Sequence, residues 1–394
     1  MNTKAASSAN LLTICLIAFF SMSGGALLGP VLPAMVEPLN TTRELIGMVL
    51  GIYTFATAIS MILIASVVDR FGRKTILIPC LLLNGAAGMG AYFTHDLDLL
   101  LALRLIQGIG VAGMLPIAMT MIGELYTGLD RVHAMGRMSM TTAIGAVSAP
   151  LIGGSMAAIT WNTPFLFYGL MIPLAIVAML ILPETNSKGM KKKTGFLEMF
   201  RPIRDIRVAH SLLLSFVIFF LLYTIVIYVP FILKDSFGFT AKGAGIALGI
   251  QGTSMALVAS QAKRMSRRFP QHAVIASGFI ISAMAVAGLA VADSLPQTVA
   301  LLLMFGAGFG AVQPFLNTLV TQVAPEGHMG SVVSLFNTMK YAGQTAAPAV
   351  LAMVLIRSDL QTAFIVSSIL GLIAASSIYL AKKDDFKATQ GHSQ

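Results

Sequence analysis

The sequence predicts an all-α integral membrane protein whose twelve transmembrane helices form two six-helix parallel repeats. Apolar runs of about twenty residues, long enough to cross a bilayer, recur along the whole chain. Only 11% of the 394 residues are charged and the mean hydropathy is +0.84, which leaves too little charge for the surface of a soluble domain. The same residue types also return at one constant offset along the chain.

The apolar runs place the twelve helices. We expect them at residues 11–36, 45–67, 74–94, 98–123, 137–159, 164–183, 210–233, 243–263, 272–292, 297–322, 330–354 and 361–381. The first run is too long for a signal-peptide core and lacks a clean cleavage site, so we expect a retained helix. An even number of helices puts both termini on one side of the membrane.

The positive charges predict which side that is. The net charge of +10 would suit a nucleic-acid binder, but the basic residues gather in every second loop rather than on one face. With the N-terminus in the cytoplasm, cytoplasmic segments hold 20 of the 26 Lys and Arg residues and outer loops hold four. We therefore expect a multi-pass plasma-membrane protein with both termini cytoplasmic, and the short loops favour a prokaryotic inner membrane.

The longest polar stretch separates two bundles. We expect an N-terminal six-helix bundle at residues 1–183, a cytoplasmic basic linker at 184–209, and a C-terminal six-helix bundle with a short cytoplasmic tail at 210–394. Within the linker, apolar residues alternate with arginines on both sides of Pro202. This pattern predicts a short interfacial helix, broken at that proline.

The two bundles are an internal repeat with an offset of 198 residues. Matching positions include Leu50-Gly51-Ile52 with Leu248-Gly249-Ile250, Arg70-Phe71 with Arg268-Phe269, Gly108 and Gly110 with Gly306 and Gly308, Pro116 with Pro314, Gly145 with Gly343, and Pro150 with Pro348. Six helices followed by six in the same orientation imply parallel halves, related by an axis along the membrane normal. We expect the binding site between the halves, near the membrane midplane.

Several segments carry a family resemblance over essentially the whole chain. They are ASVVDRFGRK at 65–74, LALRLIQGIGVAG at 101–113, GAVSAPLIGG at 145–154, GPVLP at 29–33 and LPET at 182–185. Together they resemble the major facilitator superfamily, and within it the twelve-helix drug:proton antiporter branch. Two positions depart from the family pattern, since Ala65 and Ala149 stand where glycines are usual.

The resemblance implies roles for two motifs. The loop residues that would form a gating latch are Asp69, Arg70, Gly72, Arg73, Lys74 and Glu124, where a carboxylate engages a helix N-terminus and an arginine. The fifth-helix antiporter motif, with Gly145, Pro150, Gly153 and Gly154, would seal the cytoplasmic side against leak. The alternatives are a solvated loop that only sets topology and generic tight packing of glycine.

Two cations stand inside apolar helices. Arg104 is expected to contact the substrate or a proton-bearing group, or to act as a hydrogen-bonding hub between helices. Lys340 lies too deep to snorkel easily, so it is expected to bind an anionic or polar group of the substrate or to carry the coupling proton. Hydrogen bonding to backbone carbonyls is the alternative for Lys340.

Amides and aromatic residues within the helices are candidates for the lining of a substrate or proton pathway. They are Gln107, Gln251, Gln313, Asn317, Asn337 and Gln344, with Tyr53, Tyr228 and Phe315. As a set they suit a broad amphipathic pocket, although interhelical hydrogen bonding would explain any one of them.

Together these features predict a secondary active transporter that works by alternating access. We expect proton-coupled efflux of small amphipathic compounds or drugs by a monomer. Because the first helix has no acidic residue, a transporter of a specific organic anion or metabolite is an alternative, and a lipid flippase is another. The chain lacks a nucleophile–base pair and a phosphate-binding loop, and its two cysteines and six histidines lack metal-ligand spacing. No enzymatic activity, cofactor, metal or nucleic-acid partner is therefore expected.

Overall fold

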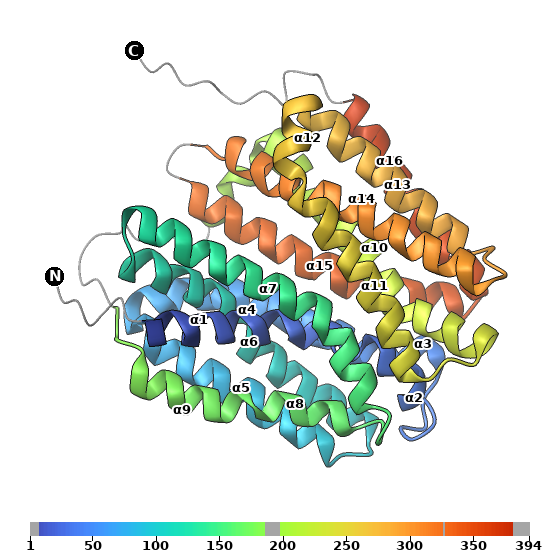
Figure 1. Ribbon diagram of the computed structural model, residues 1–394, viewed down its shortest axis with the longest axis horizontal. Helices are drawn as coiled ribbons and strands as arrows, with labels where there is room; N and C mark the ends of the chain where they lie inside the picture. Colours follow the sequence, from blue (N-terminus) through green and yellow to red (C-terminus); the bar gives the residue numbers. More distant parts are fainter. Residues whose placement is uncertain (1–7, 186–197, 326–327, 381–394) are drawn as a thin grey trace. The chain divides into compact units, whose positions relative to one another are not determined.

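The computed structural model describes residues 8–185, 198–325 and 328–380, without the side chains of residues 65–70 and 198–199. Every regular element in these ranges is a helix (Figure 1). The first part of the expected basic linker and the C-terminal tail lie outside the described residues.

Six membrane-spanning segments make up the first half of the chain. The first combines α1 (Ser8–Ala26), η1 (Gly29–Val31) and α2 (Leu32–Met35), and the second combines α3 (Arg43–Ile46) with α4 (Met48–Phe71). Three long helices follow, α5 (Arg73–Tyr92), α6 (Leu97–Leu125) and α7 (Gly128–Met156). The sixth segment is built from η2 (Thr163–Phe165), α8 (Leu166–Gly169) and α9 (Met171–Ile181).

The second half begins with η3 (Glu198–Arg204), a 3₁₀ turn that contains Pro202. Its long helices are α10 (Ile206–Phe237), α11 (Ala241–Ser260), α13 (Gln271–Leu289), α14 (Leu295–Gln322), α15 (Met329–Leu355) and α16 (Leu360–Leu380), and the short α12 (Ala262–Arg268) follows α11. Twelve membrane segments result, as expected from the sequence.

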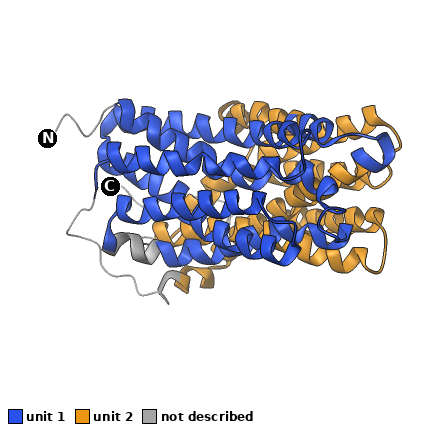
Figure 2. Cartoon of the chain, turned by 90° about the horizontal axis from the view of Figure 1, so that it is seen from below, with its two compact units in different colours: residues 1–192, 233–249 blue, residues 193–232, 250–394 orange. Residues whose placement is uncertain are grey.

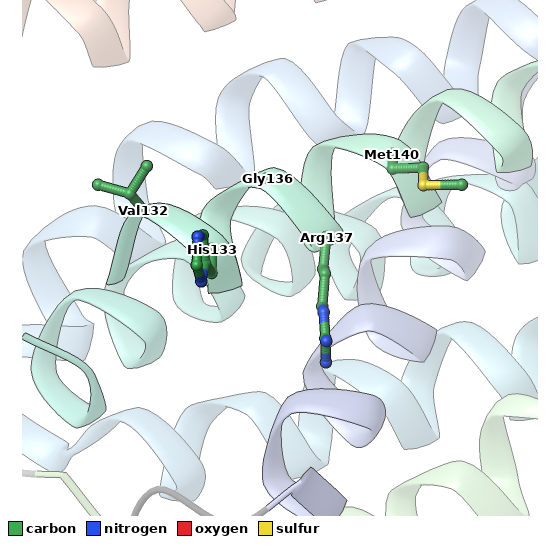
Figure 3. Close-up of a pocket in the computed structure, with 5 residues that line it drawn as sticks. All are labelled: Val132, His133, Gly136, Arg137 and Met140. Atoms are coloured by element: carbon green, nitrogen blue, oxygen red, sulfur yellow. The ribbon is translucent and has the colours of Figure 1, made fainter. Parts of the chain in front are cut away.

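Ten of the twelve segments are apolar and long enough to cross a membrane on composition alone, and the exceptions are α7 and α15. α7 also begins at Gly128, nine residues before the expected start at residue 137. Its first turns are polar and exposed, so hydropathy does not register them. Figure 3 shows this region, where His133 and Arg137 help to line an open hollow formed by α7 alone.

The described chain divides into two compact units, coloured separately in Figure 2. Unit 1 comprises residues 1–192 and 233–249, and unit 2 comprises residues 193–232 and 250–394. The end of α10 and the start of α11 therefore pack with the first half of the chain. Within unit 1, α6 contacts α1, α4 and α5, and within unit 2, α13 contacts α14 and α16.

The offset of 198 residues reappears in the packing of each unit. A Cβ placed on Gly108 would overlap the Tyr53 carbonyl oxygen and the Ala56 side chain, and one on Gly306 would meet the equivalent Gln251 oxygen and Ser254 side chain. A Cβ on Gly110 would meet Cys80 and Asn84, and one on Gly308 would meet Gly278 and Ser282, again 198 residues later. In both repeats, glycine thus permits close approach of the same pairs of helices.

Candidate functional site

Arg104 is the centre of a polar network inside unit 1. Its side chain is fully buried on α6, where Nε donates to the Val49 carbonyl oxygen at 3.0 Å and Nη1 donates to Gln107 Oε1 at 2.5 Å. The guanidinium also lies 4.1 Å from the ring centroid of Tyr53, a distance typical of a cation–π contact. Two of the predicted lining residues, Gln107 and Tyr53, therefore contact Arg104.

Tyr168 extends this network to further helices. Its hydroxyl lies 3.5 Å from Arg104 Nη1 and donates to the Gly24 carbonyl oxygen at 2.7 Å. Contacts from one guanidinium and one phenol thus connect segments from α1, α4, α6 and α8. Among the described residues, Arg104 Nη2 and Gln107 Nε2 have no hydrogen-bond acceptor. The network therefore joins four helical segments, and two of its buried N–H donors are not used by the described residues.

Lys340 has a different environment inside unit 2. It is partly buried on α15, and its Nζ donates to Asn317 Oδ1 on α14 at 3.3 Å. The ammonium lies 4.5 Å from the ring centroid of Phe336 and 5.6 Å from that of Phe219 on α10. Between residues 198 and 380, as far as the structure describes them, no carboxylate forms an ion pair with Lys340. We call Lys340, Asn317, Phe219, Phe336 and Gln344 the Lys340 cluster.

Gln344 stands one helical turn after Lys340 on α15. The residue is 91% buried, and its Oε1 accepts no hydrogen bond from the described residues. The other predicted lining residues of unit 2 have separate surroundings, since Gln251 is buried on α11 near the Met255 sulfur, 3.9 Å away. Tyr228 and Phe315 are buried, while Gln313 and Asn337 are partly exposed and make no hydrogen bond to Lys340.

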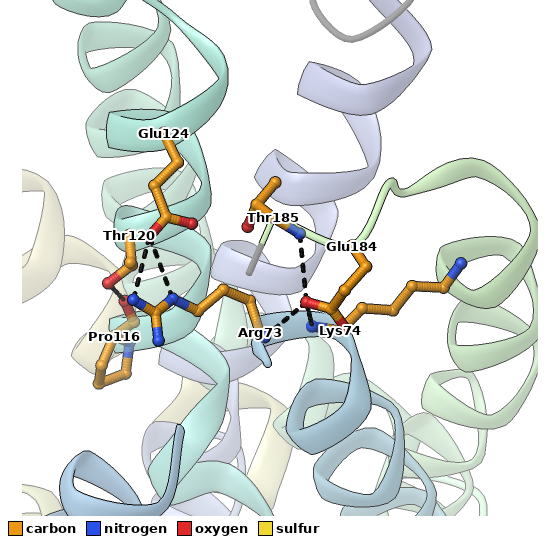
Figure 4. Close-up of polar contacts among 7 residues, drawn as sticks. All are labelled: Arg73, Lys74, Pro116, Thr120, Glu124, Glu184 and Thr185. Carbon is orange, nitrogen blue, oxygen red and sulfur yellow. Dashed lines mark hydrogen bonds and ion pairs between the residues drawn. The ribbon is translucent and has the colours of Figure 1, made fainter. Parts of the chain in front are cut away.

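The loop between α4 and α5 holds part of the predicted latch. Gly72 has φ +97°, a conformation that favours glycine, and directly precedes α5. Arg73 is buried and directs Nε and Nη2 at Glu124 Oε1, at 3.2 and 3.0 Å, which ties the start of α5 to the end of α6 (Figure 4). The side chains of Asp69 and Arg70 lie outside the described residues.

Glu184, just beyond α9, caps α5 and was not predicted as a site residue. Its Oε1 accepts from the backbone N–H groups of Arg73 at 2.7 Å and Lys74 at 3.2 Å. Its Oε2 accepts from the backbone N–H and the hydroxyl of Thr75, both at 3.1 Å. Figure 4 shows this carboxylate facing the first turn of α5, where it satisfies N–H groups that have no partner within the helix.

The capping contacts lower the pKa of Glu184. Burial of the carboxyl acts to raise its pKa, but hydrogen bonds from Lys74, Thr75 and Arg73 outweigh burial and hold the pKa below its ordinary value. A Cβ at Gly72 would come within 2.8 Å of the same carboxyl group. Glycine at position 72 therefore serves both the backbone turn and the approach of Glu184.

The glycines of the fifth-helix motif all lie at close contacts of α7. A Cβ on Gly145 would come within 2.7 Å of the Phe19 carbonyl oxygen, and one on Gly153 would overlap the carbonyl oxygen of Leu27. A Cβ on Gly154 would overlap the carbonyl oxygen of Ala241, while Pro150 faces Gly245 through its own carbonyl oxygen. α7 therefore approaches both the α1 segment and the start of α11 closely enough that larger side chains would be excluded.

Two polar contacts join the end of α10 to other parts of unit 1. Asp235 Oδ2 pairs with Arg43 Nη2 at 2.6 Å, and Lys234 Nζ donates to the Pro33 carbonyl oxygen at 3.0 Å. Both partners of the ion pair are 42% exposed, so the pair contributes little to stability.

The searched residues contain no group of three His, Cys, Asp or Glu side chains that could hold a metal ion.

Comparison with known proteins decides the family. A sequence profile of the Major Facilitator Superfamily matches residues 14–348. The chain belongs to the Major Facilitator Superfamily. As a superfamily transporter it is similar to the bacillibactin exporter of Bacillus subtilis (strain 168), with 26% identity over 357 residues, 87% of this chain and 89% of that protein. Multidrug resistance protein 1 of the same organism is 26% identical over 340 residues, 84% and 85% of the two chains.

A solved structure shows the same fold. The crystal structure of a bacterial homologue of the human lysosomal transporter Spinster, inward-facing and unoccupied, gives a TM-score of 0.83. The alignment covers 99% of this chain and all of that chain, at 18% sequence identity. This likeness shows the fold, and the family match makes the chain a multi-pass membrane transporter.

Proposed function

We propose that the protein exports small amphipathic compounds by alternating access, in exchange for protons. We place it in a bacterial inner membrane with both termini in the cytoplasm, because of the 20 to 4 distribution of Lys and Arg. The similarity to the bacillibactin exporter and to multidrug resistance protein 1 extends over most of each chain, and it supports a role in export.

The packing of α7 is the observation that carries the proposal. Gly145, Gly153 and Gly154 let this helix lie against backbone carbonyl groups from the α1 segment and from α11. A tight seam with no side chain between backbones limits leakage of ions along it, which an exporter that uses a proton gradient requires. The residues proposed for contact with the substrate are those of the Lys340 cluster in unit 2. The Arg104 network of unit 1 is proposed as a hub that holds helices together.

A reconstituted transport assay tests the proposal. The full-length protein in vesicles with an acidic lumen is expected to accumulate chloramphenicol while protons leave, as read by a pH dye inside the vesicles. Collapse of the gradient with nigericin should abolish accumulation, and ethidium should be a poorer substrate than chloramphenicol. Gradient-independent accumulation would contradict proton exchange, and movement of a labelled phospholipid without any uptake would favour a flippase.

Two glycine variants test the role of α7. Gly153→Ala is expected to lower the transport rate, because the added Cβ overlaps the Leu27 carbonyl oxygen. Gly136→Ala is the matched control on the same helix, since its Cβ would meet no atom within 4 Å. Equal transport by the two variants would show that the close seam does not matter for export.

A further inference from the structure

Lys340 has hydrogen-bonding capacity that its neighbours do not use. An ammonium carries three N–H donors, and the structure directs one of them at Asn317 Oδ1 over 3.3 Å. Resting on the transport function proposed above, we propose that the Lys340 cluster binds the anionic group of the substrate. The substrate class is then an organic anion with an apolar or aromatic body.

The distribution of charged residues around Lys340 in unit 2 favours an anionic ligand. The four helices α13, α14, α15 and α16 contain no Asp or Glu, and Lys340 is the one charged residue of α15. Its described neighbours are a neutral amide and two phenyl rings. A cation inside a membrane helix is costly without compensation, and these four helices supply no carboxylate for it.

The rings beside Lys340 stabilise a cation without neutralising it. The face of a phenyl ring attracts an ammonium but accepts no proton, so the charge remains available to a ligand. Phe219 also packs edge-to-face on Phe309, with ring centroids 5.3 Å apart, and Phe309 lies 6.2 Å from Phe305. An ammonium at the margin of an aromatic cluster suits a ligand that has one negative group and an apolar body.

Gln344 supplies an independent sign that this site can bind a polar group. Its Oε1 is buried one turn from Lys340 and has no partner among the described residues. A buried polar atom without a partner is costly, whereas a hydroxyl or N–H group of a bound ligand would satisfy it. The cluster therefore offers donors from Lys340 and an acceptor from Gln344 along one side of α15.

Binding of three matched probes to the full-length protein in detergent tests this inference. Naphthoate, naphthamide and naphthylmethylammonium share one aromatic body and differ in charge, and calorimetry measures each affinity. The wild-type protein is expected to bind naphthoate about tenfold to a hundredfold more tightly than naphthamide, as for a hydrogen bond to a charged group. Naphthylmethylammonium is expected to bind most weakly.

Substitutions test whether Lys340 causes the preference for naphthoate over naphthamide. Lys340→Met is expected to lose the preference for naphthoate while its affinity for naphthamide stays the same, which also shows that the variant is folded. Lys340→Arg should keep the preference, since it keeps the charge. Lys242→Met is the control, because it removes one positive charge from an exposed position.

Two results would overturn the inference. The first is wild-type protein that binds naphthoate no more tightly than naphthamide, or not at all. The second is an equal loss of affinity for naphthoate and naphthamide in Lys340→Met, which would give Lys340 a structural role or a role in proton transport. Failure of the proposed function is a separate result, since it appears as absence of gradient-driven uptake of both chloramphenicol and naphthoate and leaves these affinities unaffected.

Discussion

Arg104 and Lys340 are both cations inside membrane helices, yet their surroundings are opposite. Arg104 is fully buried and is held by a carbonyl oxygen, an amide oxygen, a phenol oxygen and an aromatic face. Lys340 is partly buried and has one long hydrogen bond and two phenyl rings. The first cation is bound by several groups of the protein, whereas within the described parts of the chain the second uses one of its three N–H donors.

From this difference we predict a structural role for Arg104 and a binding role for Lys340. A guanidinium that connects four helical segments cannot leave its partners without exposing several buried polar atoms. An ammonium with few partners can exchange them for a ligand at little cost. Loss of Arg104 should therefore act on folding, and loss of Lys340 should act on binding.

The largest expected effect is that of Arg104→Met on stability. Removal of the guanidinium leaves the Val49 carbonyl oxygen and Gln107 Oε1 without their donor. We expect a loss of about 3 kcal/mol or more, as for breaking one partner out of a buried charged network. A markedly lower melting temperature in detergent would show it, and a melting temperature equal to that of the wild type would remove the contrast between the two cations.

Tyr168→Phe should give an intermediate loss. The change removes a hydroxyl that donates to the Gly24 carbonyl oxygen and lies near Arg104, but keeps the ring in place. A loss of about 1 kcal/mol is expected for one buried hydrogen bond, measured by thermal unfolding. Tyr379→Phe is the control because Tyr379 is 63% exposed, and a similar loss there would mean that the network is not special.

Glu184→Gln extends the comparison to a charge outside the membrane segments. The folded pKa of Glu184 is lowered, so its contribution is present above the ordinary value of 4.5 and is lost as the pH falls through the folded pKa. At neutral pH the variant should melt at a lower temperature than the wild type, and the gap should close on acidification. Asp293→Asn, at an exposed position, is the control and should melt at the wild-type temperature at neutral pH.

The smallest expected effect on stability is that of Lys340→Met. Replacing an under-satisfied cation with an apolar side chain should change the free energy of unfolding by no more than about 0.5 kcal/mol, or stabilise slightly. Melting of this variant alongside Arg104→Met makes the comparison direct. A loss as large as that of Arg104→Met would mean that Lys340 is a second structural hub.

The fold was predictable because bilayer thickness and repetition both leave direct traces in a sequence. The runs of apolar residues gave the number of membrane segments, and the offset of 198 residues anticipated the paired contacts of Gly108 and Gly306. The start of α7 was predicted nine residues too late, at residue 137 instead of Gly128. Its first turns carry polar residues, and a hydropathy pattern assigns such residues to a loop. Helix type and number depend on local composition, whereas helix ends depend on contacts.

The candidate sites were predictable only in part. The spacing of Arg104 and Gln107 puts them on one helix face, but nothing local indicates Tyr168, which lies 64 residues away. From the sequence, Glu184 could be recognised only as a residue at the end of a helix. Its capping of α5 could not be predicted, because the contact joins residues more than a hundred positions apart. Residue types inside apolar runs reveal that a charge needs a partner, and only the folded chain identifies that partner.

The single charge of α15 also has an electrical consequence. A bound anion would cancel the charge of Lys340, whereas Arg104 is held by contacts inside unit 1. In the scheme proposed above, the loaded Lys340 cluster is neutral and the empty one carries +1. The membrane field does work of about 2.3 kcal/mol on a full charge that crosses 100 mV. Voltage would then act on the return of the empty transporter more than on the export of its cargo.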